Sequence, residues 1–332
     1  MNNCTICKSE ETRELLKWNK YTINKCNNCQ LIFTTPLPSD NELNKFYQSF
    51  MFKKPENDEI RKRTKKRKKE LKKLFNFSDI SETHLNKRFL DFGGGTGIAY
   101  NSISELGFDA YYHDPDNEAV KFTADKFGLT PEKTINDINK CNIKFDYILS
   151  DNVIEHVRSP YDFVKNLLNK LENGGTLVIK TPHASNTEII LNPVISINGY
   201  FLTALKNNSL KRAIQAYLAR FWHCDPPRHL YSFSKNSLSR MMAKLQTSKI
   251  DFGISYYHTE WFDNTITRKF FLRPKRLKGL RSVFIRLIIF PVLPVEILLQ
   301  IIKHLFLKLG ILSPGGIILR INKHQIAANE RH

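Results

Sequence analysis

The sequence is short of acidic side chains. Its 332 residues include 32 Asp and Glu against 51 Lys and Arg, which gives a formal net charge of +19. Such a balance favours an anionic partner, for example nucleic acid, a phospholipid surface or a phosphate-bearing sugar. Lys, Asn and Ile are abundant throughout the chain, so compositional drift without a function is the other explanation. Composition alone leaves the partner open.

The first 30 residues have no apolar core segment, so we expect no secretory signal peptide and a cytoplasmic protein. Beyond one lysine-rich run, the chain has no evident internal repeat or low-complexity tract. A hydrophobic fraction of 41% in a chain of this length supports a substantial core, as one large domain with appendages or as two domains.

The most apolar region, residues 283–312, lacks the unbroken run that a membrane span requires, because Pro291 and Pro294 interrupt it. From residue 295 onward, polar residues recur at steps of three to four, which predicts an amphipathic helix. These residues are Glu296, Gln300, Lys303, His304 and Lys308. We expect the helix to pack over the sheet or the substrate pocket, with peripheral membrane contact as the alternative.

Cysteine is scarce, yet four of the six cysteines lie near the N-terminus in two Cys-x2-Cys pairs. They are Cys4, Cys7, Cys26 and Cys29. This spacing predicts a zinc ribbon, in which four thiolates bind a structural Zn²⁺ and leave no open coordination position. Disulfides are the alternative, which the lack of a secretory signal disfavours. Cys141 and Cys224 are isolated, and we expect both to be buried as small apolar residues.

Glycine is also uncommon, with 14 in the chain, yet four glycines fall within residues 93–97. An apolar strand with Phe89 and Leu90 precedes them, and Asp91 stands at its end. Glycine permits positive φ and lets a bulky ligand lie against the main chain. Phosphate often binds behind such turns, but the carboxylate of Asp91 repels a pyrophosphate and attracts a cationic or amine-bearing ligand. No glycine follows Gly97 at the offset that the dinucleotide-binding motif requires.

A second acidic site follows, at Asp114 and Asp116, where a short strand over 110–113 gives way to a helix. In a doubly wound sheet, a carboxylate at the end of the second strand can accept hydrogen bonds from ribose hydroxyls. Asp114 is the candidate for this role. Turn formation or helix capping is the alternative for both residues.

The following segments make the pattern specific: a strand over 144–150, Ile154-Glu-His-Val157, a helix over 160–171, Gly174-Gly175, and a strand over 176–182 ending in Thr-Pro-His. Residues 85 to 183 resemble class I S-adenosylmethionine-dependent methyltransferases of the ubiquinone-methyltransferase-like branch. The first motif of that class, acidic-x-Gly-x-Gly-x-Gly, corresponds here to Asp91, Gly93, Gly95 and Gly97.

The resemblance implies an α/β fold with a Rossmann-like, doubly wound, seven-stranded sheet whose last strand is antiparallel. It implies that Asp91 lies near the methionine amine of the cofactor, and that the Gly93–Gly97 backbone lies against its homocysteine part. Asp114 would bind the ribose, and Asn136 or Asp137 would reach the adenine amine. Asp151, after the strand over 144–150, completes the expected cofactor-binding set.

Three regions are expected along the chain. Residues 1–35 form the zinc ribbon, residues 36–83 a helical linker, and residues 84–332 the methyltransferase domain with an insertion at 184–230 and the amphipathic segment 283–312. The linker contains a helix capped by Ser39 or Asp40 and a basic helix over 61–73. That basic helix has little apolar surface, so we expect a solvated face or an electrostatic contact with an anionic partner.

Methyl transfer needs alignment of donor and acceptor, and removal of a proton when the acceptor is a hydroxyl or an acidic carbon. The acceptor is expected outside the carboxyl ends of the strands over 144–150 and 176–182. His156, His183 and His229 are the candidate general bases there, because neutral imidazole titrates near working pH. Each could instead have a structural role, as His156 would by hydrogen bonding to the backbone.

Some ubiquinone O-methyltransferases bind a divalent cation through two glutamates and a histidine in this stretch. Glu155 and His156 match that pattern, but Asn152 stands where the first glutamate would be. The departure speaks against metal-assisted catalysis.

The layout of ribbon and catalytic domain also resembles sugar methyltransferases of bacterial surface-polysaccharide and deoxysugar pathways. The expected acceptor is therefore an anionic small molecule or glycan: a sugar of a surface polysaccharide or of a nucleotide- or lipid-linked precursor. The alternatives are a zinc-ribbon RNA methyltransferase, a methyltransferase for a quinone or lipid, and a non-catalytic binding protein. Asp151-Asn-Val-Ile154 stands where base-modifying enzymes often have an Asn-Pro-Pro-Tyr-like motif, which disfavours RNA.

Overall fold

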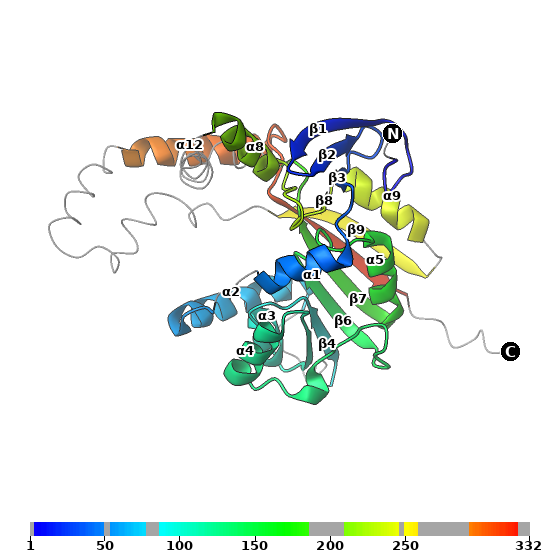
Figure 1. The fold of residues 1–332 in the computed structure, drawn as a ribbon. Helices are drawn as coiled ribbons and strands as arrows, with labels where there is room; N and C mark the ends of the chain where they lie inside the picture. Colours follow the sequence, from blue (N-terminus) through cyan, green and yellow to red (C-terminus); the bar gives the residue numbers. More distant parts are fainter. Residues whose placement is uncertain are drawn as a thin grey trace.

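The structure is a computed structural model that describes residues 3–49, 54–77, 86–185, 209–245, 249–257 and 292–324. These residues form two sheets, a central six-stranded sheet and a four-stranded sheet near the N-terminus (Figure 1). No helix in the described ranges combines the length and the apolar character that crossing a membrane would take.

The central sheet has the order β5-β4-β6-β7-β10-β9. Strands β5, β4, β6 and β7 run parallel, whereas β10 is antiparallel to both β7 and β9. The bounds are β4 Arg88–Phe92, β5 Asp109–His113, β6 Phe145–Asp151, β7 Leu171–Pro182, β9 Ile250–Tyr257 and β10 Gly316–Lys323. The antiparallel last strand confirms that part of the expected fold.

Side chains alternate between the two faces along each strand, and apolar side chains lie on both faces. Helices therefore cover both faces of this sheet. Phe89 packs with α2, α3 and α4 on one face, while the next residue, Leu90, packs with α5 and α9 on the other (Figure 1). The helices are α2 Asn57–Phe75, α3 Ile98–Ser104, α4 Asn117–Phe127, α5 Pro160–Asn169 and α9 Lys235–Leu245. The result is the α/β layering that the sequence predicts.

The sheet has six strands in the described residues, so the expectation of seven is not confirmed. The segment between α4 and β6 makes one isolated bridge, between Tyr112 and Thr134, in place of a strand. A 3₁₀ turn over Pro131–Lys133 occupies its start. Proline has no N–H to donate to a ladder, so pairing next to β5 stays minimal.

The N-terminal sheet has the order β1-β2-β3-β8. Strands β1 Thr12–Trp18, β2 Tyr21–Cys26 and β3 Ile32–Thr35 belong to the ribbon, whereas β8 Tyr231–Ser232 comes from far along the chain. β3 and β8 are antiparallel, with Phe33 opposite Tyr231. The core of the ribbon is also continuous with side chains of α9, so the ribbon is packed into the catalytic domain.

The basic helix is α2, and it is longer and better packed than its sequence suggests. Ile60, Thr64, Leu71 and Phe75 are buried on one side, where the helix packs on α3 and on the sheet. The other side is exposed and cationic, as expected. Its exposed cations are Arg61, Lys62, Arg63, Lys65, Lys66, Lys69 and Lys73.

Three more helices complete the described chain: α1 Asp40–Ser49, α8 Leu210–Phe221 and α12 Val292–Lys308. The predicted amphipathic helix exists as α12, but its polar side is the buried one. Gln300 and Lys303 are each 3% exposed, whereas Leu298 and Ile301 are more than half exposed. At these positions the polar side chains are buried and the apolar side chains are exposed, which is the opposite of the expected packing. Residues 186–208 of the predicted insertion and residues 283–291 lie outside the described residues.

Candidate functional site

The glycine turn follows β4 directly and leads into α3. Gly93, Gly95 and Gly97 have φ values of 74°, 52° and 67°, a region that side chains other than glycine rarely adopt. A Cβ at Gly94 would come within 2.4 Å of the Tyr112 ring, whereas a Cβ at Gly95 would meet nothing within 4 Å. The turn is thus tightly packed on its inner side and open at Gly95, where a ligand can approach the backbone.

Asp91 lies beneath this turn and is only 2% exposed. Its Oδ2 accepts a hydrogen bond of 2.9 Å from the backbone N–H of Tyr100, in the first turn of α3. Burial raises the pKa of Asp91 to about 7, although the nearby Arg67 opposes this. The carboxylate therefore fixes the turn against α3, and its expected contact with a methionine amine stays a prediction.

Asp114 connects the end of β5 to the same turn. Its Oδ2 accepts a hydrogen bond of 2.8 Å from Gly95 N–H, and its Oδ1 accepts one of 2.9 Å from Asp116 N–H. Asp116 instead caps α4 by accepting from Glu118 N–H, so the capping alternative holds for Asp116. Asp114 is where a ribose-binding carboxylate is expected, beside the open Gly95.

A stacked pair that the sequence did not single out lies at the same edge. The rings of Phe92 and His113 are parallel, with centroids 4.0 Å apart. Burial lowers the pKa of His113 to about 4, although Asp137 opposes the shift, so His113 is neutral near pH 7. The candidate adenine contact, Asp137, accepts a hydrogen bond from Asn139 N–H. The only sequence signal for His113 was its place at the end of β5, next to Asp114.

Asp151 lies at the end of β6 in a network of four charges. Its Oδ2 is 2.7 Å from Nη1 of Arg67 and 3.0 Å from Nζ of Lys180. Glu70 completes the network because its carboxylate pairs with both Arg67 and Lys180. Burial raises the pKa of Asp151, but Arg67 and Lys180 outweigh it and hold the pKa below its usual range. Arg67 was hidden in the lysine-rich run, and a lone lysine in the apolar strand β7 was the only signal for Lys180.

The candidate bases His156 and His229 come together, with ring centroids 4.7 Å apart. His156 Nδ1 lies 2.8 Å from the carbonyl oxygen of Arg228 and 2.9 Å from the hydroxyl of Tyr47. A carbonyl only accepts, so Nδ1 carries the proton and Nε2 has the free lone pair. Burial lowers the pKa of His156 to about 3, which keeps this ring neutral.

His229 is oriented in a similar way by a carboxylate. Its Nδ1 is in contact with Oδ1 of Asp225, which accepts the hydrogen bond, so Nε2 is again the nitrogen with the free lone pair. Leu230 N–H donates to the carbonyl of Glu155 at 2.9 Å and ties the His229 loop to the segment that leaves β6. That segment also meets the glycine turn, because a Cβ at Gly93 would lie 2.4 Å from Val153.

Glu155 is buried beside the two imidazoles. Its Oε2 accepts from Thr181 at 3.1 Å, whereas Oε1 has no hydrogen-bond partner in the described part of the chain. One ligand atom each from Glu155, His156 and His229 lies within 4.8 Å of the others, so this set could hold a divalent cation. Asn152 is not part of it, since its amide bonds to Asp151. Burial raises the pKa of Glu155 to about 8.

The third candidate base, His183, is not brought into this cluster. Its Nδ1 is 3.2 Å from the backbone N–H of Ser185, and its ring lies edge-on to Tyr256 with centroids 5.8 Å apart. Burial lowers its pKa. A catalytic role for His183 remains only a prediction from the sequence.

The four ribbon cysteines converge. Their Sγ atoms pair at 3.5 Å, Cys4 with Cys29 and Cys7 with Cys26, and all four lie within 4.8 Å of one another. Bonds of about 2.3 Å in tetrahedral geometry would separate the sulfurs by roughly 3.8 Å. All are free thiols, and a disulfide would require about 2.05 Å. The donor set fits a tetrahedral Zn²⁺, which stays a prediction. Cys224 is buried as expected, whereas Cys141 is only partly so.

The fold and the glycine turn define a Rossmann-like α/β methyltransferase. A family described as "Methyltransferase domain" matches residues 47–247, more than half of the chain, and the chain belongs to this family. It is accordingly an S-adenosylmethionine-dependent methyltransferase, and membership leaves its acceptor unspecified.

Individual relatives are more distant. The ubiquinone biosynthesis O-methyltransferase of Cereibacter sphaeroides is 32% identical over 100 residues, which are 28% of this chain and 40% of that protein. The chain therefore matches less than half the length of this curated relative.

Two solved structures illustrate the likeness in fold. The plantazolicin methyltransferase BpumL, in complex with a pentazolic desmethylPZN analog and SAH, is 13% identical with a TM-score of 0.42, over 87% of this chain and 92% of that one. Phospholethanolamine N-methyltransferase 2 of Haemonchus contortus is 12% identical with a TM-score of 0.47, over 79% and 53%.

Proposed function

We propose that the protein transfers a methyl group to a sugar of a surface polysaccharide or of its nucleotide- or lipid-linked precursor. The observation that carries this proposal is the pairing of His156 and His229 where β6 and β7 end, next to the glycine turn. A hydroxyl acceptor needs a base at that point. The O-methyltransferase relative from Cereibacter sphaeroides supports oxygen as the acceptor atom.

The residues around the glycine turn fit S-adenosylmethionine. The open side of Gly95 would accommodate the homocysteine part, the Asp114 carboxylate would accept from the ribose, and Asp137 with the Phe92–His113 pair would receive the adenine. When bound, the cofactor supplies an electrophilic methyl group. The charge network of Asp151, Arg67 and Lys180 borders the same strand ends.

His229 is the stronger candidate for the base. Its Nε2 would take the hydroxyl proton while the Asp225 carboxylate stabilises the resulting imidazolium through Nδ1. His156 is held neutral by burial, and its Nδ1 is engaged by Arg228 and Tyr47, so it would orient the acceptor through Nε2.

The first test is His229→Ala. We expect turnover to fall by roughly 100-fold or more, the usual contribution of a general base, with cofactor affinity close to that of the unaltered protein. Asp225→Asn should reduce turnover less, since it keeps the shape but loses the charge. His324→Ala serves as the matched control, because His324 follows β10 and pairs with Asp251, outside the cluster. Equal turnover in His229→Ala and in the unaltered protein would rule out this base.

The acceptor itself is tested by comparing glycans and lipid extracts of a deletion strain with those of its parent by mass spectrometry. We expect one glycan or glycan precursor to lose the mass of a methyl substituent. A loss confined to quinones or lipids would favour the lipid-acceptor alternative. A loss confined to ribosomal or transfer RNA would favour an RNA methyltransferase instead.

One observation favours RNA as the second candidate: the cationic side of α2, on which seven basic residues are exposed. Contacts between such cations and phosphates weaken steeply with salt. Tight, salt-sensitive binding to total RNA in a mobility-shift assay would support this candidate, and weak binding would leave the glycan proposal in place.

A further inference from the structure

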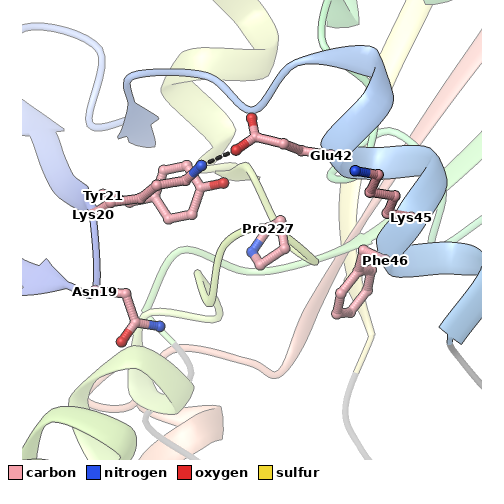
Figure 2. A pocket seen from close by; sticks show the side chains of 7 residues that line it. All are labelled: Asn19, Lys20, Tyr21, Glu42, Lys45, Phe46 and Pro227. Carbon is pink, nitrogen blue, oxygen red and sulfur yellow. Dashed lines mark ion pairs between the residues drawn. The ribbon is translucent and has the colours of Figure 1, made fainter.

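A pocket of about 570 Å³ lies between the ribbon and the catalytic domain (Figure 2). Its size falls within the range of small-ligand sites. Three segments supply its walls: the turn between β1 and β2, the helix α1, and the loop that precedes His229. The lining residues are Asn19, Lys20, Tyr21, Glu42, Lys45, Phe46 and Pro227.

The pocket walls belong to the chain segments that contact or carry the two candidate bases. Pro227 lies two residues before His229. On the opposite wall, Phe46 is followed by Tyr47, whose hydroxyl is 2.9 Å from His156 Nδ1. Each wall therefore includes a residue one or two positions from a candidate base or from a residue that contacts one.

The ribbon wall is fixed in place relative to the catalytic loop. Trp18 Nε1 donates a hydrogen bond of 3.0 Å to the carbonyl of Pro226, and Gln215 in α8 donates one of 3.1 Å to the carbonyl of Lys17. Pairing of β3 with β8 anchors the other end of the same loop. The position of the β1–β2 turn over the loop is thus built into the fold.

The polar lining suits an anion. Ser39 N–H donates to Glu42 Oε2 at 2.7 Å in a capping box at the start of α1, and the other carboxylate oxygen of Glu42 pairs with Lys20. This arrangement holds the Lys20 ammonium at the rim. Lys45 lies across the pocket on α1, and among the described residues no carboxylate pairs with it (Figure 2). Lys45 is therefore the cation available to a ligand.

The remaining lining suits a ring. Phe46 and Pro227 lie below the two lysines, and the Tyr21 ring lies against Lys20 (Figure 2). Aromatic faces beside polar groups bind the flat, C–H-rich side of a sugar, while ammonium groups bind phosphate oxygens.

We infer that this pocket is the acceptor subsite, and that it binds the phosphate-bearing sugar of the acceptor through Lys45 with the ring against Phe46 and Pro227. This inference rests on the proposed function. It makes the ribbon a wall of the acceptor site, since the β1–β2 turn contributes Lys20 and Tyr21.

Glucose 1-phosphate is a soluble probe for this subsite, with glucose as its uncharged counterpart. We expect saturation-transfer NMR to detect the ring protons of glucose 1-phosphate on the full-length protein, and to detect little or nothing for glucose. Lys45→Glu should weaken the binding of glucose 1-phosphate by at least tenfold, because reversing the charge of the side chain replaces attraction of the phosphate by repulsion. Phe46→Ala should reduce the transfer to the ring protons.

Lys165→Glu is the matched control, since Lys165 is an exposed lysine of α5 away from the pocket lining. It should bind the probe like the unaltered protein. Equal affinity of Lys45→Glu and the control, or no binding of glucose 1-phosphate to the unaltered protein, would overturn the subsite. Calorimetry with S-adenosylmethionine separates this result from the proposed function: a protein that binds the cofactor but not the probe loses only the inferred subsite.

Discussion

The cofactor half and the acceptor half of the site are built in different ways. Every candidate cofactor residue lies between Asp91 and Asp151, along consecutive strands and turns of the central sheet. The acceptor half is assembled from segments far apart in the chain, namely the β1–β2 turn, α1, the segment after β6 and the loop before β8 (Figure 1). The first half is local and the second is tertiary.

This difference implies that the two halves should fail separately. The glycine turn depends on backbone conformation and on close packing with β5 and α4. The acceptor half depends on how the ribbon is seated, through β3–β8 pairing and the Trp18–Pro226 hydrogen bond. Variants in one half should leave the other half largely functional, and the following measurements test this separation.

The largest effect on the cofactor half is expected from Asp91→Ala. The unaltered protein should bind S-adenosylmethionine with micromolar affinity, on the order of 8 kcal/mol. The substitution leaves Tyr100 N–H without its acceptor at the start of α3, so we expect calorimetry to detect no binding. Asp91→Asn, which keeps an acceptor, should retain part of the affinity. Full affinity in Asp91→Ala would refute the role of this residue.

Removal of the metal predicted in the ribbon should impair the acceptor half of the site. If four thiolates hold a Zn²⁺ as predicted, Cys26→Ser should release about one Zn²⁺ per chain, measured by elemental analysis. Since the ribbon forms a wall of the pocket, we expect turnover to fall by roughly 100-fold or more while cofactor affinity stays near normal. Cys141→Ser controls for loss of a thiol outside the ribbon. A chain that contains no zinc when freshly purified and reduced would contradict the ribbon assignment.

A smaller effect, on pH dependence, is expected at His113 in the cofactor half. Its folded-state pKa of about 4 lies below the usual histidine pKa of 6.5, because burial disfavours the charged ring. The unfolded chain therefore binds a proton first as pH falls, and the stability contributed by neutral His113 is lost between pH 6.5 and about 4. His113→Phe should remove this loss, at most about 3 kcal/mol. Chemical denaturation at pH 7 and pH 4.5 measures it, and identical pH dependence in both proteins would contradict the assigned shift.

The smallest effect is expected from Ser39→Ala at the start of α1. Loss of the capping box should lower the free energy of unfolding by about 1 kcal/mol. The same change loosens Glu42 and therefore Lys20, so glucose 1-phosphate should bind slightly more weakly, with cofactor affinity unchanged. Thermal denaturation and probe titration measure the two effects. An equal loss of cofactor affinity would show that the halves are coupled.

Sequence patterns could predict a candidate cofactor half because its signals are local. Glycine at positions with positive φ, and carboxylates at strand ends, are dictated by a few neighbouring residues. The same locality explains the misses. Arg67 was one cation among many in a basic helix, and only packing of α2 on the sheet shows that it pairs with Asp151. His113 was missed because its ring stacks on Phe92, which belongs to the neighbouring strand.

The outcomes for α12 and for the sheet have physical reasons of the same kind. Periodicity correctly placed the helix at Val292–Lys308, but periodicity does not say which side is buried, and Gln300 and Lys303 are buried. Likewise, the resemblance implied seven strands, whereas a proline and a 3₁₀ turn before Thr134 leave a single bridge there.

The sequence by itself determined the class of protein, the glycine turn and the four-cysteine spacing, because each depends on residue identity at short range. It also named His156 and His229 as candidate bases. Only the tertiary structure decided that these two rings meet, that His183 stands apart, and that the ribbon closes over the catalytic loop. Contacts such as Phe33 with Tyr231 join residues about 200 positions apart, and short-range patterns carry no information about such pairings.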